Sequence, residues 1–167
     1  MSTRRHGVWL GVMIACAALF GCAGGEWEKV EIEQGYRVPK QLTITVIAAP
    51  TEKERAEALA NALVEELHKG GIVGVVVPAA GGAAEMNVTL YRSEFRPRGF
   101  AWAMTRDGQV VVVVEVDTAT LGIEGTAYGW VKNKSDPSNA AAAVGKLIGK
   151  TIATGRVTSD MRSPGAP

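Results

Sequence analysis

The sequence predicts an α+β fold: an antiparallel or mixed sheet of about five strands that carries two helices packed on one face, in the order β-α-β-β-β-β-α. Three observations support this prediction. Several segments between residues 42 and 130 alternate apolar and polar side chains with a period of two, as strands with one buried face do. Two segments space their apolar residues as helices do, and they flank a run of strands. The 167 residues suffice for one such domain.

The first strand is expected at 42–48, where apolar residues alternate with threonines, and the first helix at 51–69. Thr51 and Glu54 have the spacing of a capping box, in which each side chain bonds a backbone donor at a helix start. Gly70 is expected to end the helix. The apolar residues that give this segment its helical spacing are Ala56, Leu59, Ala60, Leu63, Val64 and Leu67.

Four further strands are expected before the last helix. The run 72–77 is continuously apolar and β-branched, which is typical of a strand covered on both faces. The segment 100–104 also alternates, and the turn signal Asp107-Gly108 joins it to the next strand as a hairpin. The expected strands lie at 72–77, 86–95, 109–117 and 121–130.

The last helix is expected at 137–154, with Pro137 in its first turn and Gly155 at its end. A single domain would therefore cover 41–155, followed by a flexible tail at 156–167 that has no periodicity. The sheet face away from the helices is a candidate docking surface. Its expected polar residues are Thr43, Thr45, Asn87, Thr89 and Tyr91.

The N-terminus has the features of a secretory signal peptide, expected at 1–21. Arg4 and Arg5 precede an apolar run that is shorter than the roughly 20 residues that cross a bilayer. The run ends in Leu19-Phe20-Gly21-Cys22, which resembles the lipobox of bacterial lipoproteins. This resemblance implies cleavage before Cys22 and anchoring of the chain in a membrane through diacylglyceryl and N-acyl groups on that cysteine. The alternative is an ordinary signal peptide that leaves Cys22 as a free thiol.

The residue after the cysteine is Ala23, and absence of aspartate there favours the outer membrane, facing the periplasm, over the inner membrane. The polar segment 22–40 is predicted to be a tether that follows the lipidated cysteine. Its eighteen residues after Cys22 could reach about 60 Å when extended. An edge strand at 30–32 is the competing possibility.

The layout is similar to that of the YajG family of bacterial lipoproteins, with local matches at 87–90, 110–116 and 139–154. The segment Arg96-Pro97-Arg98 departs from the family pattern. The resemblance implies a periplasm-facing envelope protein, related in general shape to accessory lipoproteins of lipid export and outer-membrane assembly. It carries over no functional residue.

The residues offer little catalytic chemistry, and neither a cofactor nor a metal site is expected. Without the leader, His68 is the one histidine, and its place in the last turn of a helix favours capping. The serines lack a nucleophile elbow, and the glycines do not form a phosphate loop. Glu115 and Asp117 share a strand face, which is read as a solvated face rather than an acid–base pair.

The charge balance argues against nucleic acid as a partner. The whole chain has a net charge of +1, and loss of Arg4 and Arg5 leaves 16 basic against 17 acidic groups, hence −1. Nucleic-acid binding needs clustered Lys and Arg side chains that displace counterions from phosphates.

The most unusual segment is 95–102, where Arg96 and Arg98 stand between aromatic residues that include Trp102. Guanidinium groups suit phosphates, and Arg and Trp are favoured anchors in interfaces. Contact with an anionic lipid headgroup or a protein partner is the functional hypothesis, and a solvated strand connection is the alternative.

The expected function is that of a non-enzymatic, membrane-anchored envelope lipoprotein that serves as a periplasmic binding or assembly accessory, with an envelope protein as partner. One alternative is a lipid-binding accessory of an envelope lipid transport system, which needs an apolar cavity between sheet and helices. Another is a hydrolase, which needs clustered polar groups.

Overall fold

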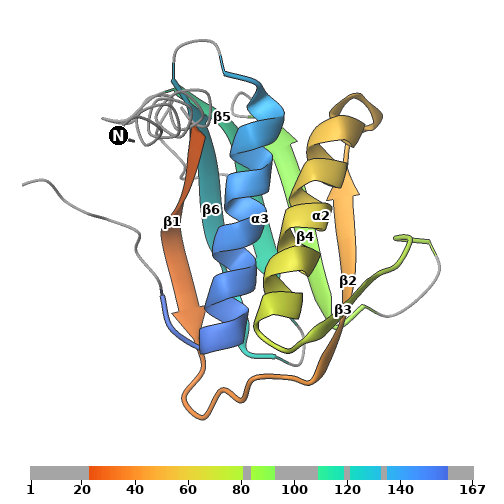
Figure 1. Cartoon of the computed structure of the whole chain (residues 1–167), viewed down its shortest axis with the longest axis vertical. Coiled ribbons are helices and arrows are strands. Elements are labelled where there is room, and N and C mark those ends of the chain that lie inside the picture. The colour runs from red at the N-terminus through yellow and green to blue at the C-terminus, as the bar shows by residue number, and fades with distance from the viewer. Residues whose placement is uncertain (1–22, 81–83, 93–108, 119–120, 133–134, 158–167) are drawn as a thin grey trace, which may run out of the picture.

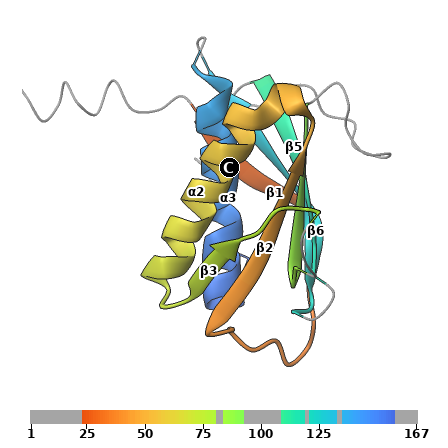
Figure 2. The ribbon, with the colours of Figure 1, turned by 90° about the vertical axis from the view of Figure 1, so that its right-hand side faces the viewer.

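Two helices lie against one face of a six-stranded mixed sheet in the computed structural model, which describes residues 23–80, 84–92, 109–118, 121–132 and 135–157 (Figures 1 and 2). The α+β class and the predicted order of elements are confirmed, with six strands rather than about five. The elements are β1 Ala23–Ile32, β2 Gln41–Ala48, the 3-10 turn η1 Pro50–Glu52, α2 Lys53–Lys69, β3 Val73–Val76, β4 Met86–Arg92, β5 Gln109–Asp117, β6 Ile123–Val131 and α3 Pro137–Thr154.

The strand order in the sheet is β1-β6-β5-β4-β2-β3. The strand pair β4 and β2 is parallel, as is the pair β2 and β3, so that α2 connects two parallel neighbours. All other neighbours run antiparallel. The sheet is therefore mixed, and β1 and β3 form its two edges.

The predicted tether over 22–40 is wrong for residues 23–32, which form β1 and pair with β6 along its length. The alternative of an edge strand at 30–32 was correct but too short. A bulge between Trp27 and Lys29 explains the error, because it shifts the alternation by one residue. Trp27 and Val30 consequently face the helices although they are three residues apart. Residues 23–32 therefore belong to the sheet, although the domain was expected to start at residue 41.

The core lies between the sheet and the two helices. Leu59, Leu63 and Leu67 of α2 are fully buried in it, as are Ile148 and Ile152 of α3. Burial of each such side chain contributes about 1.5–3 kcal/mol. The strands supply the other half of this core, chiefly Leu42, Ile44, Met86, Val88, Val112, Val114, Ile123 and Ala127.

Glycines bring the two layers into close contact. A Cβ on Gly25 of β1 would lie 2.9 Å from the backbone nitrogen of Val144, and one on Gly129 of β6 would lie 2.7 Å from the carbonyl oxygen of Ala140. Both neighbours belong to α3, so this helix rests on the backbone of the sheet. Gly145 and Gly149 bring α3 against α2 in the same way. These interfaces leave no room for a side chain at the glycine positions.

The helix ends differ from the prediction at one point. The structure has η1 at Pro50–Glu52, and no side chain caps the start of α2, so the capping box of Thr51 and Glu54 does not form. Glu52 is buried instead and accepts a hydrogen bond of 2.7 Å from Arg55. The bounds of α3 are as predicted, and Gly155 ends it with a left-handed φ of 61°.

The strand at 72–77 was predicted to be covered on both faces, and this is wrong. It is the edge strand β3, in which Val73, Val75 and Val76 are 57%, 41% and 45% exposed. A β-branched run indicates strand propensity, whereas burial depends on what lies on either side. The expected strand segments 93–95 and 100–104 lie outside the described residues, as does most of the expected tail.

Candidate functional site

The predicted site residues Cys22, Arg96, Arg98 and Trp102 lie outside the described residues. Their described neighbours, however, define one end of the sheet. Ala23, which follows Cys22, begins β1, and the segment that contains the other three residues leaves β4 at Arg92 and enters β5 at Gln109.

The strand register brings these neighbours together. Ala23 and Gln109 both pair with Val131, the last residue of β6, and Arg92 pairs with Val112 of β5. We call this the Ala23 end of the sheet. The start of β1, the end of β6 and the start of α3 lie there in Figure 1. The chain neighbour of Cys22 and both ends of the 93–108 connection thus belong to one end of the molecule.

Trp130 is the large side chain at this end that the sequence analysis missed. It pairs with Gly24, and its indole ring lies across this glycine, because a Cβ there would be only 2.6 Å from the Cε2 atom of Trp130. The ammonium nitrogen of Lys132 lies 5.7 Å from the centre of the indole ring, within the range of a cation–π contact. The sequence carries little signal for this contact, because a glycine at position 24 does not by itself indicate that an aromatic ring packs on it.

The sheet face away from the helices, here called the open sheet face, carries the five residues predicted for it. Thr45 and Asn87 pair across β2 and β4, out of phase with the core residues Ile44 and Val88. Thr43, Thr89 and Tyr91 follow the same alternation. The predicted phase is therefore confirmed, although Thr45 is itself buried.

Two tyrosines of the open sheet face donate hydrogen bonds to carboxylates. The hydroxyl of Tyr128 donates to Glu26 over 2.8 Å, and that of Tyr91 donates to Glu115 over 3.1 Å. Burial, followed by the hydrogen bond and the charge of Glu115, raises the pKa of Tyr91. The carboxylate of Glu115 thus accepts a hydrogen bond from a phenol of the neighbouring strand.

The tyrosines flank a small second hydrophobic cluster. Val110 and Val113 of β5 are fully buried on this face, and Tyr91 and Tyr128 pack against them. Val113 stands directly between the two tyrosines in the strand register. The two valines were predicted only as members of a strand.

An open groove of about 520 Å³ lies between α2 and the edge strand β3. His68 lines it, as do Glu65 and Val76. Glu65 forms an ion pair of 2.7 Å with Lys69, and this pair lowers the pKa of the carboxyl group. The groove is also lined by Asn61, Val64, Val73 and Gly74.

Neither a metal centre nor a bilayer-crossing helix is found within the described ranges. No group of three His, Cys, Asp or Glu side chains there is arranged to hold a metal ion. Neither α2 nor α3 combines the length and the hydropathy that crossing a bilayer requires.

The chain matches no protein-family model and no curated protein. Two solved structures of PelC dodecamers from Paraburkholderia phytofirmans are similar to it. One is a single-residue variant, with a TM-score of 0.48 and 12% sequence identity over 78% of this chain and 96% of that chain. The other has a TM-score of 0.48 and 13% identity over the same shares.

Proposed function

We propose that the chain is an exported lipoprotein, anchored through acyl groups on Cys22, whose domain serves as a non-enzymatic binding or assembly accessory at a membrane of the cell envelope. The observation that supports this proposal is that β1 begins at Ala23, directly after the cysteine of the lipobox-like motif. The proposed location is the outer membrane, facing the periplasm, and the proposed partner is an envelope protein.

Because no spacer would separate Cys22 from β1, the proposed lipid anchor would hold the domain close to the bilayer. Consecutive Cα atoms lie about 3.8 Å apart, so the first residue of the sheet would lie that far from the lipidated cysteine. The reach of about 60 Å expected for a tether is lost. The domain would rest on the bilayer surface and would present its partner-binding surface at a fixed height.

The position of the connection 93–108 favours one role for Arg96 and Arg98. Both ends of this connection, Arg92 and Gln109, lie at the Ala23 end. Anionic phospholipid headgroups would be close to that end in the lipidated protein. Contact of the two guanidinium groups with headgroup phosphates is therefore favoured over contact with a protein farther from the membrane.

The close packing of the two layers argues against a lipid carrier. A carrier would need an apolar cavity between sheet and helices. Gly25 and Gly129 instead bring the backbone of the sheet against the backbone of α3. We therefore prefer an accessory that binds a partner on its surface.

Metabolic labelling with palmitate tests the anchor. In cells that produce the full chain, Cys22→Ala is expected to abolish labelling and to prevent cleavage at the lipoprotein junction, because the acceptor thiol is lost. Cys16→Ala is the matched control, since Cys16 lies within the leader, and it is expected to remain labelled. Labelling of Cys22→Ala at the level of the unchanged protein would refute the proposal.

A further inference from the structure

The indole ring of Trp130 lies close to the proposed lipid anchor. It is half-buried on the backbone of Gly24, two residues after Cys22. A fully extended chain spans at most about 3.6 Å per residue, so Gly24 is within roughly 7 Å of Cys22. The sheet register fixes this closeness, because Gly24 and Trp130 are paired residues of β1 and β6.

This distance matches the thickness of the lipid headgroup layer. A bilayer measures about 30 Å across its hydrocarbon core and about 40–45 Å with both headgroup layers, which leaves roughly 5–7.5 Å for each layer. With the acyl chains of Cys22 in the hydrocarbon, the ring of Trp130 would therefore lie at headgroup depth. Trp27 is farther along β1, and its indole nitrogen donates to Thr151 of α3 over 3.0 Å.

The chemistry of this end suits a phospholipid surface. Tryptophan is enriched at membrane–water interfaces because its ring is apolar and its N–H is polar. Lys132 beside the ring adds a cation that anionic headgroups attract.

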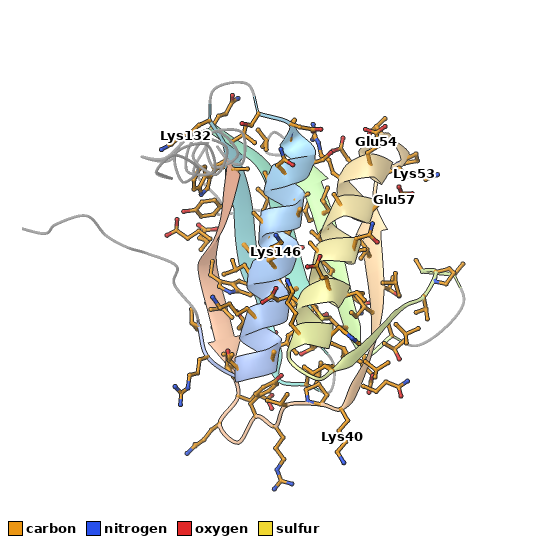
Figure 3. The ribbon with its side chains drawn as sticks, in the orientation of Figure 1. Lys40, Lys53, Glu54, Glu57, Lys132 and Lys146 are labelled. Carbon is orange, nitrogen blue, oxygen red and sulfur yellow. The ribbon has the colours of Figure 1, made fainter. Side chains whose placement is uncertain are left out.

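We infer that Trp130, with Lys132 beside it, contacts phospholipid headgroups and sets the orientation of the domain on the bilayer. The inference rests on the proposed function, because the lipid on Cys22 brings the Ala23 end to the membrane. Lys132 and Lys40 lie at opposite ends of the domain (Figure 3). In the inferred orientation Lys132 would lie at the bilayer and Lys40 far from it.

Quenching by brominated lipid tests the contact. Lipidated protein is purified from membranes, and the mass of its N-terminal peptide is measured. It is then reconstituted into phosphatidylethanolamine–phosphatidylglycerol vesicles with or without bromine near the headgroup end of the acyl chains. A Trp102→Phe background leaves only Trp27 and Trp130 in the processed chain. Bromine is expected to quench the emission of this protein, and adding Trp130→Phe is expected to remove most of the quenching.

A second measurement does not depend on replacing the tryptophan. A polarity-sensitive fluorophore on Lys132→Cys is expected to shift its emission to the blue in vesicles, whereas the same fluorophore on Lys40→Cys is expected to remain unshifted. Equal emission at the two positions, or quenching that persists in Trp130→Phe, would overturn the inference while leaving the anchor intact. An N-terminal peptide without acyl groups would overturn the proposed function, and this inference with it.

Discussion

At the scale of single residues, two aromatic side chains tie the N-terminal part of the chain to α3. Trp27 donates its indole N–H to Thr151, whose hydroxyl in turn donates to the carbonyl of Leu147 over 2.9 Å. Tyr36, in the connection between β1 and β2, donates its hydroxyl to the carbonyl of Ile152 over 2.6 Å. Both residues occupy a segment that the sequence analysis predicted to be a tether, so their roles could not be predicted from composition.

Ionisation of Tyr36 is expected to lower the stability of the protein at alkaline pH. Burial raises the pKa of its phenol from 10 to about 12. Folding therefore favours the neutral phenol, and this stabilisation is complete below pH 10 and is lost as the pH rises through 12. Tyr36→Phe removes the hydrogen bond and is expected to lower the free energy of unfolding at neutral pH by about 1 kcal/mol.

Urea unfolding of both proteins at several pH values measures this effect. The difference between unchanged protein and Tyr36→Phe is expected to shrink between pH 10 and 12. Other titrating groups are common to both proteins and cancel in the comparison. A difference that stays constant over this range would show that the phenol does not carry the pH dependence.

At the scale of elements, glycine positions decide how α3 packs. Gly145 and Gly149 stand four residues apart on the side of α3 that contacts α2, and the backbone of Leu59 and Leu63 approaches them closely. Glycine is a poor helix former, so local propensity alone would disfavour these positions. These glycines instead allow the close contact between the two helices. A single sequence does not reveal this contact.

The substitution Gly145→Ala tests whether helix propensity or the packing of α3 on α2 dominates at this position. Alanine raises helix propensity by about 1 kcal/mol. Its Cβ, however, would collide with the carbonyl oxygen of Leu59 and lie 3.1 Å from the backbone nitrogen of Leu63. Such overpacking costs about 1–3 kcal/mol. We therefore expect no gain, and up to about 2 kcal/mol of net destabilisation, measured as a lower urea midpoint.

Lys146→Ala is the matched control for this experiment. Lys146 is the next residue of α3 and is exposed (Figure 3). Its replacement is expected to change the free energy of unfolding by less than about 0.5 kcal/mol. A Gly145→Ala protein that is clearly more stable than the unchanged protein would contradict the close contact of the two helices.

At the scale of the whole molecule, the inclusion of β1 in the sheet is the feature with the largest consequence for function. A tethered domain could search a volume beyond the membrane, whereas in the proposed lipoprotein a domain that begins one residue after the anchor would be held at the surface. The same inclusion places Gly24, Trp130 and the ends of the 93–108 connection at one end.

Hydrogen–deuterium exchange distinguishes a domain whose sheet includes β1 from a domain that follows a flexible tether. Amides of 23–32 that pair with β6 are expected to exchange slowly, because opening them requires separating β1 from the sheet. A peptide covering the connection 33–40 serves as the internal control and is expected to exchange faster. Equal, fast exchange in both peptides would indicate a tether, and the orientation inferred for the domain would lose its basis.

The sequence by itself determined the α+β class, the places of β2, α2, β4, β5, β6 and α3, and the phase of the open sheet face, because these follow from local periodicity that burial imposes. It missed the full length of β1, where one bulge breaks the alternation, and the exposure of β3. Only the tertiary structure decided which strands are edges and which residues meet at the Ala23 end. Strand pairing joins residues as distant in sequence as Gly24 and Trp130, and no local pattern encodes such a pairing.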